Sequence, residues 1–199
     1  DSNFFSFLTN PIVLKILVFS FLYLSVVEVF SICELPILNK NNIVTDKQIS
    51  TVYITTLIGN VISILYLPNF FKKYNQNIII SLNIFLSYFV IYFFLKSETT
   101  HMFSLFGFLF GLGNGLYGFS VGLMILNEKS MNSRKSFYLI NSLISSLFSL
   151  AAGLLLNLTS LSLVLVVFKK IMLIYSIFIF FYLIFFCLKL YSGKITKFL

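Results

Sequence analysis

The chain has 199 residues, of which 59% are hydrophobic and only 10% are charged, and its formal net charge is +8. A mean hydropathy of +1.00 leaves too little polar material for a soluble domain on either side of a membrane. The basic residues form no patch with interleaved aromatic residues, so the charge does not indicate nucleic-acid binding. The two cysteines match no metal or redox spacing, and no cofactor is expected.

Six long apolar runs fill almost the whole chain and are separated by short polar loops. Each has roughly 18–25 residues, the length that crosses a hydrocarbon core about 30 Å thick at a rise of about 1.5 Å per residue. Almost no charge lies on any face of these runs, unlike the surface of a soluble amphipathic helix. They predict an all-α, multi-pass protein of the lipid bilayer, with one domain over residues 1–199 and spans at residues 12–32, 50–70, 78–95, 102–126, 137–156 and 171–190.

The first run carries a carboxylate, Glu28, with Ser25 and Ser31 three residues away on the same helix face. An intramembrane carboxylate is costly and usually faces a cavity or a partner. Two interpretations stay open. Glu28 takes part in substrate, proton or gate chemistry, or it lies at the membrane interface, with Glu34 and Pro36 marking the true end of the helix.

The second run has a stripe of small and polar residues at helical spacing: Val52, Thr56, Gly59, Asn60 and Ser63. Asn60 lies near the middle of the span, where its amide needs hydrogen-bond partners. It lines a pathway, or it forms hydrogen bonds with a neighbouring helix. The sequence does not decide between these two roles.

The fourth and fifth runs are also rich in small and polar residues. The fourth contains Asn114 and the small-xxx-small rows Gly107, Gly111, Gly115 and Gly118, Gly122, which allow another backbone to come close. The fifth contains Asn141, Ser142, Ser145, Ser146, Ser149 and Gly153. The third and sixth runs are dominated by Ile, Leu, Phe and Tyr. We therefore expect two helices that face lipid and four that face a cavity.

One motif resembles a catalytic signature but predicts no enzyme. Residues 118–122 read G-F-S-V-G, which matches the G-x-S-x-G of a nucleophile elbow. That motif needs a strand, a sharp turn and a helix, whereas here it lies inside an apolar run. The single histidine, His101, precedes Ser120 by roughly 28 Å along the same helix. Catalysis by this pair is excluded unless the helix breaks.

Basic residues are distributed unequally between alternate loops, and Lys and Arg near span ends favour the cytoplasmic side. Nine lie on one side: Lys15, Lys72, Lys73, Lys129, Arg134, Lys135, Lys189, Lys194 and Lys197. Five lie on the other: Lys40, Lys47, Lys96, Lys169 and Lys170. Both termini are therefore expected on the cytoplasmic side of a plasma or organelle membrane.

Three segments at the ends of these runs carry a further pattern. The loop Pro68–Tyr74 reads P-N-F-F-K-K-Y, the glycine-rich fourth run ends in Asn127-Glu128 before Arg134-Lys135, and Leu8–Pro11 lead into the first run. These segments resemble the G-x-x-x-D-R-x-G-R-R loop, the Glu-then-Arg signature and the entry to the seventh helix of the major facilitator superfamily. The resemblance covers the whole chain.

The resemblance implies that the chain is one six-helix half, the C-terminal one, of a longer transporter. A second six-helix half and a small polar metabolite would be its partners, and transport would proceed by alternating access. The family's cavity lies among the first, second, fourth and fifth helices, the four that polarity also selects. The expected substrate-binding residues are Glu28, Asn60, Ser63, Asn114, Asn141 and Ser145. The expected gating residues are Asn69, which stands at the family's aspartate position, Lys72, Lys73, Glu128 and Arg134.

A second class of function fits the same pattern. In a non-transporting membrane subunit or assembly scaffold, the polar stripes would hold helices together and the glycine rows would pack against a partner. A second six-helix block in the parent gene favours transport, whereas a start codon just before Asp1 favours the scaffold.

Overall fold

The computed structural model describes residues 10–40, 46–71, 73–97, 99–127 and 131–195. They form six helices: α1 Pro11–Lys40, α2 Asp46–Phe71, α3 Gln76–Phe94, α4 Thr100–Leu126, α5 Met131–Leu158 and α6 Leu161–Ile195. All six are long and apolar enough to cross a membrane. The expectation of an all-α chain with six such helices is confirmed.

Local sequence signals account for several helix ends. Pro11 begins α1, where its missing N–H would have no helical partner in any case. The side chain of Asn75 accepts a hydrogen bond from the N–H of Asn77 at the start of α3. Thr99 accepts one from the N–H of Met102 at the start of α4. Both caps supply an acceptor to a helix terminus that otherwise has unpaired donors.

Two helices extend beyond the expected spans. Helix α1 passes through Glu34 and Pro36 and ends at Lys40, so these residues do not mark its end. Helix α6 begins at Leu161 and has 35 residues, which places Lys169 and Lys170 inside the helix and not in a loop. No Gly or Pro lies between residues 161 and 170, so nothing in the local sequence interrupts the helix there.

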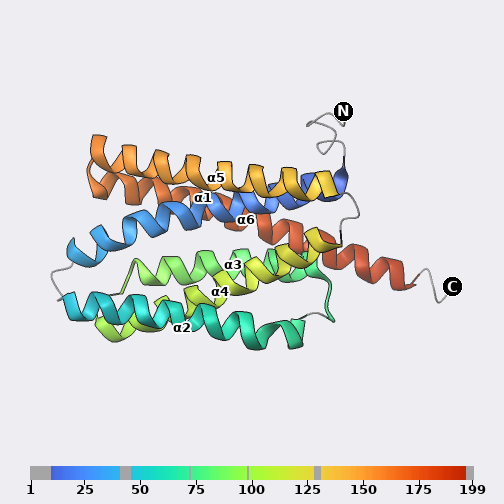
Figure 1. The fold of residues 1–199 in the computed structure, drawn as a ribbon, viewed down its shortest axis with the longest axis horizontal. Coiled ribbons are helices and arrows are strands. Elements are labelled where there is room, and N and C mark those ends of the chain that lie inside the picture. The colour runs from blue at the N-terminus through green and yellow to red at the C-terminus, as the bar shows by residue number, and fades with distance from the viewer. Residues whose placement is uncertain (1–9, 41–45, 72, 98, 128–130, 196–199) are drawn as a thin grey trace.

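The helices form two layers of three (Figure 1). Helices α5, α1 and α6 make one layer, and α2, α4 and α3 make the other. The largest contact joins α2 to α4, and further contacts join α1 to α5, α3 to α4, α3 to α6 and α1 to α6. Let α1, α2 and α3 exchange places with α4, α5 and α6 in that order. The α2–α4 contact then becomes the α5–α1 contact, and the α3–α4 contact becomes the α6–α1 contact, and both of these are present. The two three-helix units thus correspond in these two contacts, whereas the α1–α3 contact has no counterpart of similar size between α4 and α6.

The contact between α2 and α4 is formed where α4 has glycines. A Cβ built on Gly111 would lie 2.0 Å from the carbonyl oxygen of Thr56, and one on Gly59 would lie 2.2 Å from that of Phe108. A Cβ on Gly107 would lie 2.8 Å from Thr56 Oγ1. The two backbones therefore approach more closely than any side chain at these positions would allow.

The two C-terminal glycines of α4 have different surroundings. An added Cβ on Gly118 or Gly122 would meet no described atom within 4 Å. Close backbone approach is therefore a property of the Gly107–Gly111–Gly115 row, which lies opposite α2.

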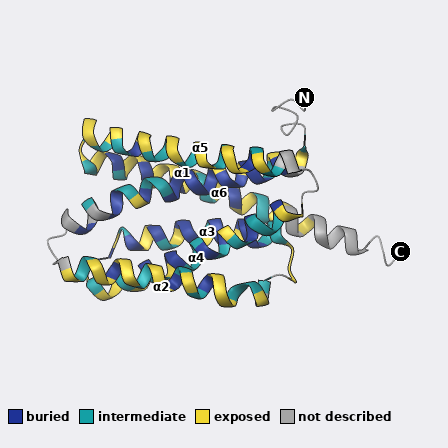
Figure 2. Cartoon of the chain, in the orientation of Figure 1, coloured by how far each residue is buried: buried dark blue, intermediate teal, exposed yellow. Residues whose placement is uncertain are grey.

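Helix α3 is more deeply buried than its apolar sequence suggested (Figure 2). In its candidate span 56% of the residues are buried, against 6% in α5 and 17% in α2. It packs against α4, α6 and α1 and keeps an exposed apolar stripe that includes Leu82, Leu86 and Phe89, so only one side of it is free to face lipid. Its uniform hydropathy could not show this, because an apolar side chain suits a protein interior and a lipid tail equally well.

Candidate functional site

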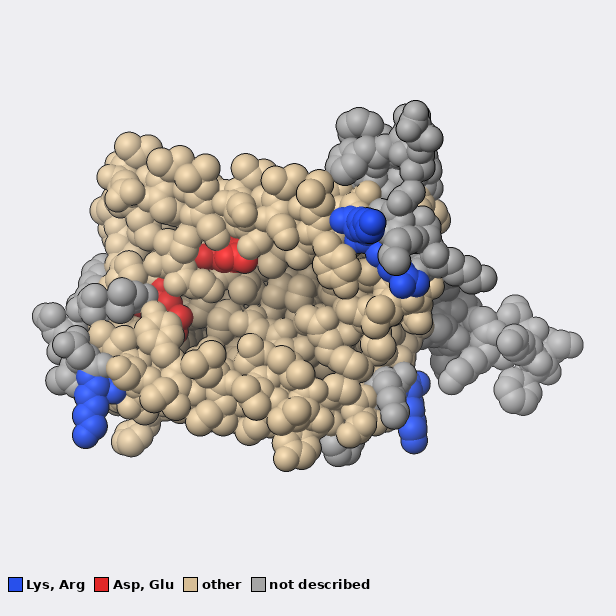
Figure 3. All heavy atoms as spheres, viewed as in Figure 1, with Lys and Arg blue, Asp and Glu red and all other residues tan. Residues whose placement is uncertain are grey.

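One face of the molecule is hollowed between the two layers of helices (Figure 3). Acidic side chains lie beside this hollow, whereas Lys and Arg lie at the two ends of the bundle. A carboxylate away from the ends of the helices needs polar partners, so the contacts of Glu28 define the candidate site.

Two hydroxyl groups of α5 hold the carboxylate of Glu28. Ser145 donates to one carboxylate oxygen at 2.5 Å, and Ser149 donates to the other at 2.9 Å. The two serines are four residues apart, so one face of α5 presents both hydroxyls to α1. Glu28 stays half-buried, and each of its oxygens has a hydroxyl donor.

The serines that share the expected face of α1 do not join this contact. Ser25 Oγ donates to the carbonyl of Leu22, and Ser31 Oγ donates to that of Val27. Both hydroxyls therefore satisfy carbonyls of their own helix, a common local solution for serine in helices.

Asn141 extends the polar stripe of α5 by one turn. It precedes Ser145 by four residues and is half-buried. Its Oδ1 atom is buried and has no hydrogen-bond partner among the described residues. An unpaired buried carbonyl oxygen can accept a bond from a bound solute. Asn141, Ser145 and Ser149 therefore supply one acceptor and two hydroxyls along one side of α5.

A second polar contact joins α1 to α4. The hydroxyl of Tyr23 donates to Asn114 Oδ1. The ring of Tyr23 stacks on that of Tyr117, with centroids 3.7 Å apart and planes 14° apart. The hydroxyl of Tyr117 in turn donates to Ser20 Oγ at 2.9 Å. Asn114 thus belongs to a tyrosine-centred contact between the two layers.

Helix α3 completes this polar interior. Asn83 Nδ2 donates to the carbonyl of Gly113 at 2.9 Å, and the hydroxyl of Tyr88 donates to the carbonyl of Leu22 at 2.6 Å. The sequence interpretation missed Asn83 and Tyr88 because α3 as a whole is so apolar, and it also missed Ser20 of α1. The available signal was the pair Asn83 and Ser87, four residues apart within an apolar run.

Asn60 and Ser63 lie in the contact between α2 and α4. Asn60 Oδ1 is 2.8 Å from the position of an added Cβ on Gly115, and the Ser63 side chain lies 2.7 Å from the same point. Ser63 is fully buried, and its Oγ atom has no hydrogen-bond partner within the described part of the chain. These two residues face α4, whereas Glu28 and Ser145 meet in the contact between α1 and α5.

The expected gating residues lie near helix ends. Asn69, at the end of α2, and Lys73 are exposed. Arg134 donates to the carbonyl of Leu126 at 3.0 Å and so links the first turn of α5 to the last turn of α4. A cation at a helix C-terminus satisfies free carbonyls and complements the helix dipole. Lys72 and Glu128 lie outside the described residues.

The serine of the G-x-S-x-G motif lies in the interior of α4. Ser120 is buried, and α4 is continuous from Thr100 to Leu126. His101 lies in the first turn of the same helix, so the fold does not bring the two residues together. Among the described residues, no three His, Cys, Asp or Glu side chains gather where they could hold a metal ion.

Comparisons with known protein families, with curated proteins and with solved structures find no match for this chain. The chemistry of the site therefore has to be inferred from its own residues. A half-buried carboxylate, two hydroxyls and an unpaired amide oxygen can bind a small polar or cationic solute through hydrogen bonds.

Proposed function

We propose that this chain is one half of a secondary active transporter of the major facilitator type, which moves a small polar metabolite by alternating access. The observation that supports this most is a partial correspondence between the two three-helix units, in which α1–α5 packing corresponds to α4–α2 packing and α1–α6 packing to α4–α3 packing. Six-helix halves of this superfamily contain two inverted three-helix repeats. The loop resemblance described above points to the same family.

The polar face of α5 is the proposed solute site. Solute groups would compete for Ser145 and Ser149, whose hydroxyls bind Glu28 in this structure. They would also reach Asn141 Oδ1, which has no partner among the described residues. Asn114 would contribute less directly, because Tyr23 already occupies its Oδ1 atom.

A second six-helix half is the proposed partner. Helix α5 exposes large apolar side chains along its length, among them Leu143, Leu147 and Leu154, and α2 exposes Leu57 and Leu65. In a two-half transporter these two helices would flank the cavity and meet the opposite half. The gate would use the helix ends that carry Asn69, Lys73 and Arg134, with the adjacent Lys72 and Glu128.

The scaffold alternative has one specific observation in its favour. Asn60, Ser63 and the row of glycines from Gly107 to Gly115 all lie in the α2–α4 contact. There they serve helix packing, which a non-transporting subunit also needs. In a transporter, water would reach Asn141, Ser145 and Ser149 on α5, whereas in a scaffold it would not.

Thiol accessibility tests the proposal. Cysteine would replace Ser145 in a background that lacks Cys33 and Cys187, and membrane-impermeant thiol reagents would be applied from each side of oriented vesicles. Ile177 is a matched control on α6, because both positions lie roughly 21–24 Å from the start of their helices and Ile177 is exposed.

Alternating access predicts that Ser145→Cys reacts from both sides and that Ile177→Cys reacts from neither. Reaction at Ser145→Cys from one side only would indicate a closed vestibule without transport. No reaction from either side would contradict a solute pathway along α5 and favour the scaffold.

A further inference from the structure

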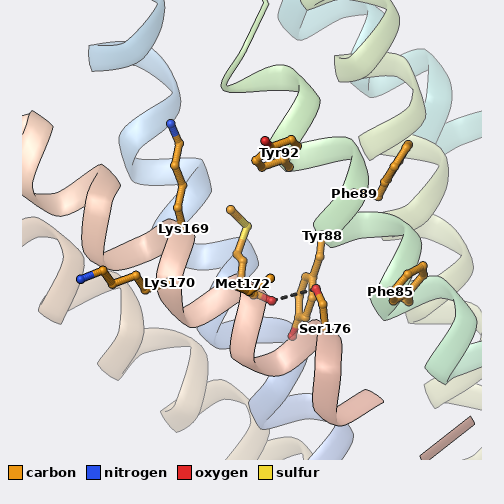
Figure 4. A pocket seen from close by; sticks show the side chains of 9 residues that line it. Phe85, Tyr88, Phe89, Tyr92, Lys169, Lys170, Met172 and Ser176 are labelled. Atoms are coloured by element: carbon orange, nitrogen blue, oxygen red, sulfur yellow. Dashed lines mark hydrogen bonds between the residues drawn. The ribbon is translucent and has the colours of Figure 1, made fainter. Parts of the chain in front are cut away.

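A groove of about 520 Å³ lies between α3 and α6 (Figure 4), in addition to the polar site described above. Aromatic side chains of α3, among them Phe85 and Phe89, form one wall. Met172 and Leu173 of α6 contribute apolar surface, and Met172 is buried between the two helices. The middle of the groove is therefore apolar.

One end of the groove is cationic. Lys169 and Lys170 line it from α6, and both are exposed. Tyr92 lines the same end from α3, and the Lys96 ammonium lies 4.8 Å from the centre of its ring. In Figure 4, Lys169 extends toward the end of the groove at which Tyr92 lies, whereas Lys170 points away from α3. Lys96 and Lys169 thus lie at the end of the groove where α3 ends, and Lys170 is next to Lys169 with its ammonium directed away.

This end of the groove lies at the expected depth of lipid headgroups. Helix α3 ends at Phe94, and Lys96 lies two residues further on, so Tyr92 and Lys96 mark a helix terminus. Tyrosines and long basic side chains concentrate at such membrane boundaries, where the amines reach the polar region. Lys169 and Lys170 share this level although they lie within α6.

The charged residues that line the groove, Lys169 and Lys170, are both basic. Among the described residues that line it, none is acidic. Two lysines inside an otherwise apolar helix are costly unless anionic groups or water compensate their charge. A basic pocket between membrane helices that continues into an apolar groove has the chemistry that recognises an anionic lipid.

We propose that the α3–α6 groove binds an anionic phospholipid, whose phosphate lies at Lys169, with the charge of the neighbouring Lys170 adding to the attraction, and whose acyl chain packs along Phe85, Phe89 and Leu173. An apolar partner helix would leave the two ammonium groups uncompensated. Free phosphate would leave the aromatic part of the groove without a ligand. The lipid satisfies both parts, and the proposal does not depend on the chain being a transporter.

The chain has no tryptophan, so a single introduced tryptophan reports locally on bound lipid. Leu173 is 63% exposed and lines the groove, which makes Leu173→Trp the reporter variant. Phe181, on the same helix and 65% exposed, does not line the groove, so Phe181→Trp is the matched control. Each purified variant would be reconstituted into phosphatidylcholine vesicles that contain either brominated phosphatidylglycerol or brominated phosphatidylcholine.

We expect brominated phosphatidylglycerol to quench the fluorescence of the Leu173→Trp variant at a severalfold lower mole fraction than brominated phosphatidylcholine. The Phe181→Trp variant should show no such preference. In the reporter variant, the double change Lys169→Gln and Lys170→Gln should lower the apparent affinity for phosphatidylglycerol roughly thirtyfold, which corresponds to the usual attraction of two basic residues near an anionic surface. The double change Lys73→Gln and Lys135→Gln, at exposed lysines outside the groove, should leave it unchanged.

Three outcomes would overturn the proposal. Equal quenching of the reporter variant by both lipids, or a preference that survives the removal of Lys169 and Lys170, would show that no anionic headgroup is recognised. Loss of the preference in millimolar inorganic phosphate, but not in chloride of equal ionic strength, would indicate a phosphate site. A reporter variant that neither lipid quenches, alongside a quenched control variant, would indicate that protein covers the groove.

Discussion

Replacing Gly111 with alanine should destabilise the bundle, because this residue lies where α4 and α2 come closest. An added Cβ would lie 2.0 Å from the carbonyl oxygen of Thr56, 2.9 Å from its carbonyl carbon and 3.0 Å from the N–H nitrogen of Asn60. All three are backbone atoms of α2, so no rotamer change relieves the overlap. The helices must separate by about 1 Å, which forfeits roughly a quarter to a half of the contact energy of the facing atoms.

The magnitude follows from two opposing terms. Overpacking in a close contact costs about 1–3 kcal/mol, and the upper end applies here because both sides of the overlap are backbone. Alanine recovers about 1 kcal/mol of helix propensity relative to glycine. The net loss of stability for Gly111→Ala is then about 2 kcal/mol. Gly118→Ala is the matched control, since it gains the same propensity and its Cβ would meet no described atom within 4 Å.

Thermal unfolding distinguishes the two variants. Cys33 is buried, so a thiol-reactive dye in a Cys187→Ser background reports when the bundle opens. A difference of about 3 kcal/mol between Gly111→Ala and Gly118→Ala corresponds to a difference of about 6–12 °C in unfolding midpoint for a chain of this length. Equal midpoints, or a Gly111→Ala midpoint above that of the unmodified chain, would show that α2 and α4 do not pack at this glycine.

Three further predictions concern the polar contacts and the topology. Tyr23→Phe removes the hydroxyl donor to Asn114 and should lower the stability of the bundle by about 1 kcal/mol. In the same dye assay this loss corresponds to an unfolding midpoint about 2–4 °C lower, whereas Tyr66→Phe, at an exposed tyrosine, should leave the midpoint unchanged. Ser149→Ala removes one of the two described hydroxyl donors to Glu28 and should cost roughly 1–2 kcal/mol; an unaltered midpoint would mean that water replaces the hydroxyl without loss. Cysteines placed in the α1–α2 loop and in the α4–α5 loop should react with impermeant reagents from opposite sides, and labelling from the same side would contradict the topology that the basic residues predict.

The glycine row shows what could be predicted from short-range pattern. Gly107, Gly111 and Gly115 are four residues apart, so they share one face of any α-helix, whatever it meets. The small residues of α2 have a similar spacing. The two stripes predicted close packing, and the structure supplied the pairing: α4 meets α2 through them.

The partners of Glu28 show what the sequence left undecided. Its hydroxyl donors, Ser145 and Ser149, lie more than a hundred residues away in the chain. Serines occur on several helices, and Ser25 and Ser31 were nearer candidates by spacing. They bond to their own helix because a serine hydroxyl can reach a carbonyl of the preceding turn.

Hydropathy and helix-breaking residues are local properties, and they were enough to predict six helices long enough to cross a membrane. The arrangement of the helices in space, in contrast, could not be predicted from local sequence. Helix α3 is apolar apart from the few polar residues on its buried side, such as Asn83 and Ser87, so its position between α4 and α6, and the contacts of Asn83 and Tyr88 that depend on it, came from tertiary packing. In a water-soluble bundle a polar face would have marked the outside. For helices as uniformly apolar as these that signal is missing, and close contacts and a few hydrogen bonds decide which helices meet.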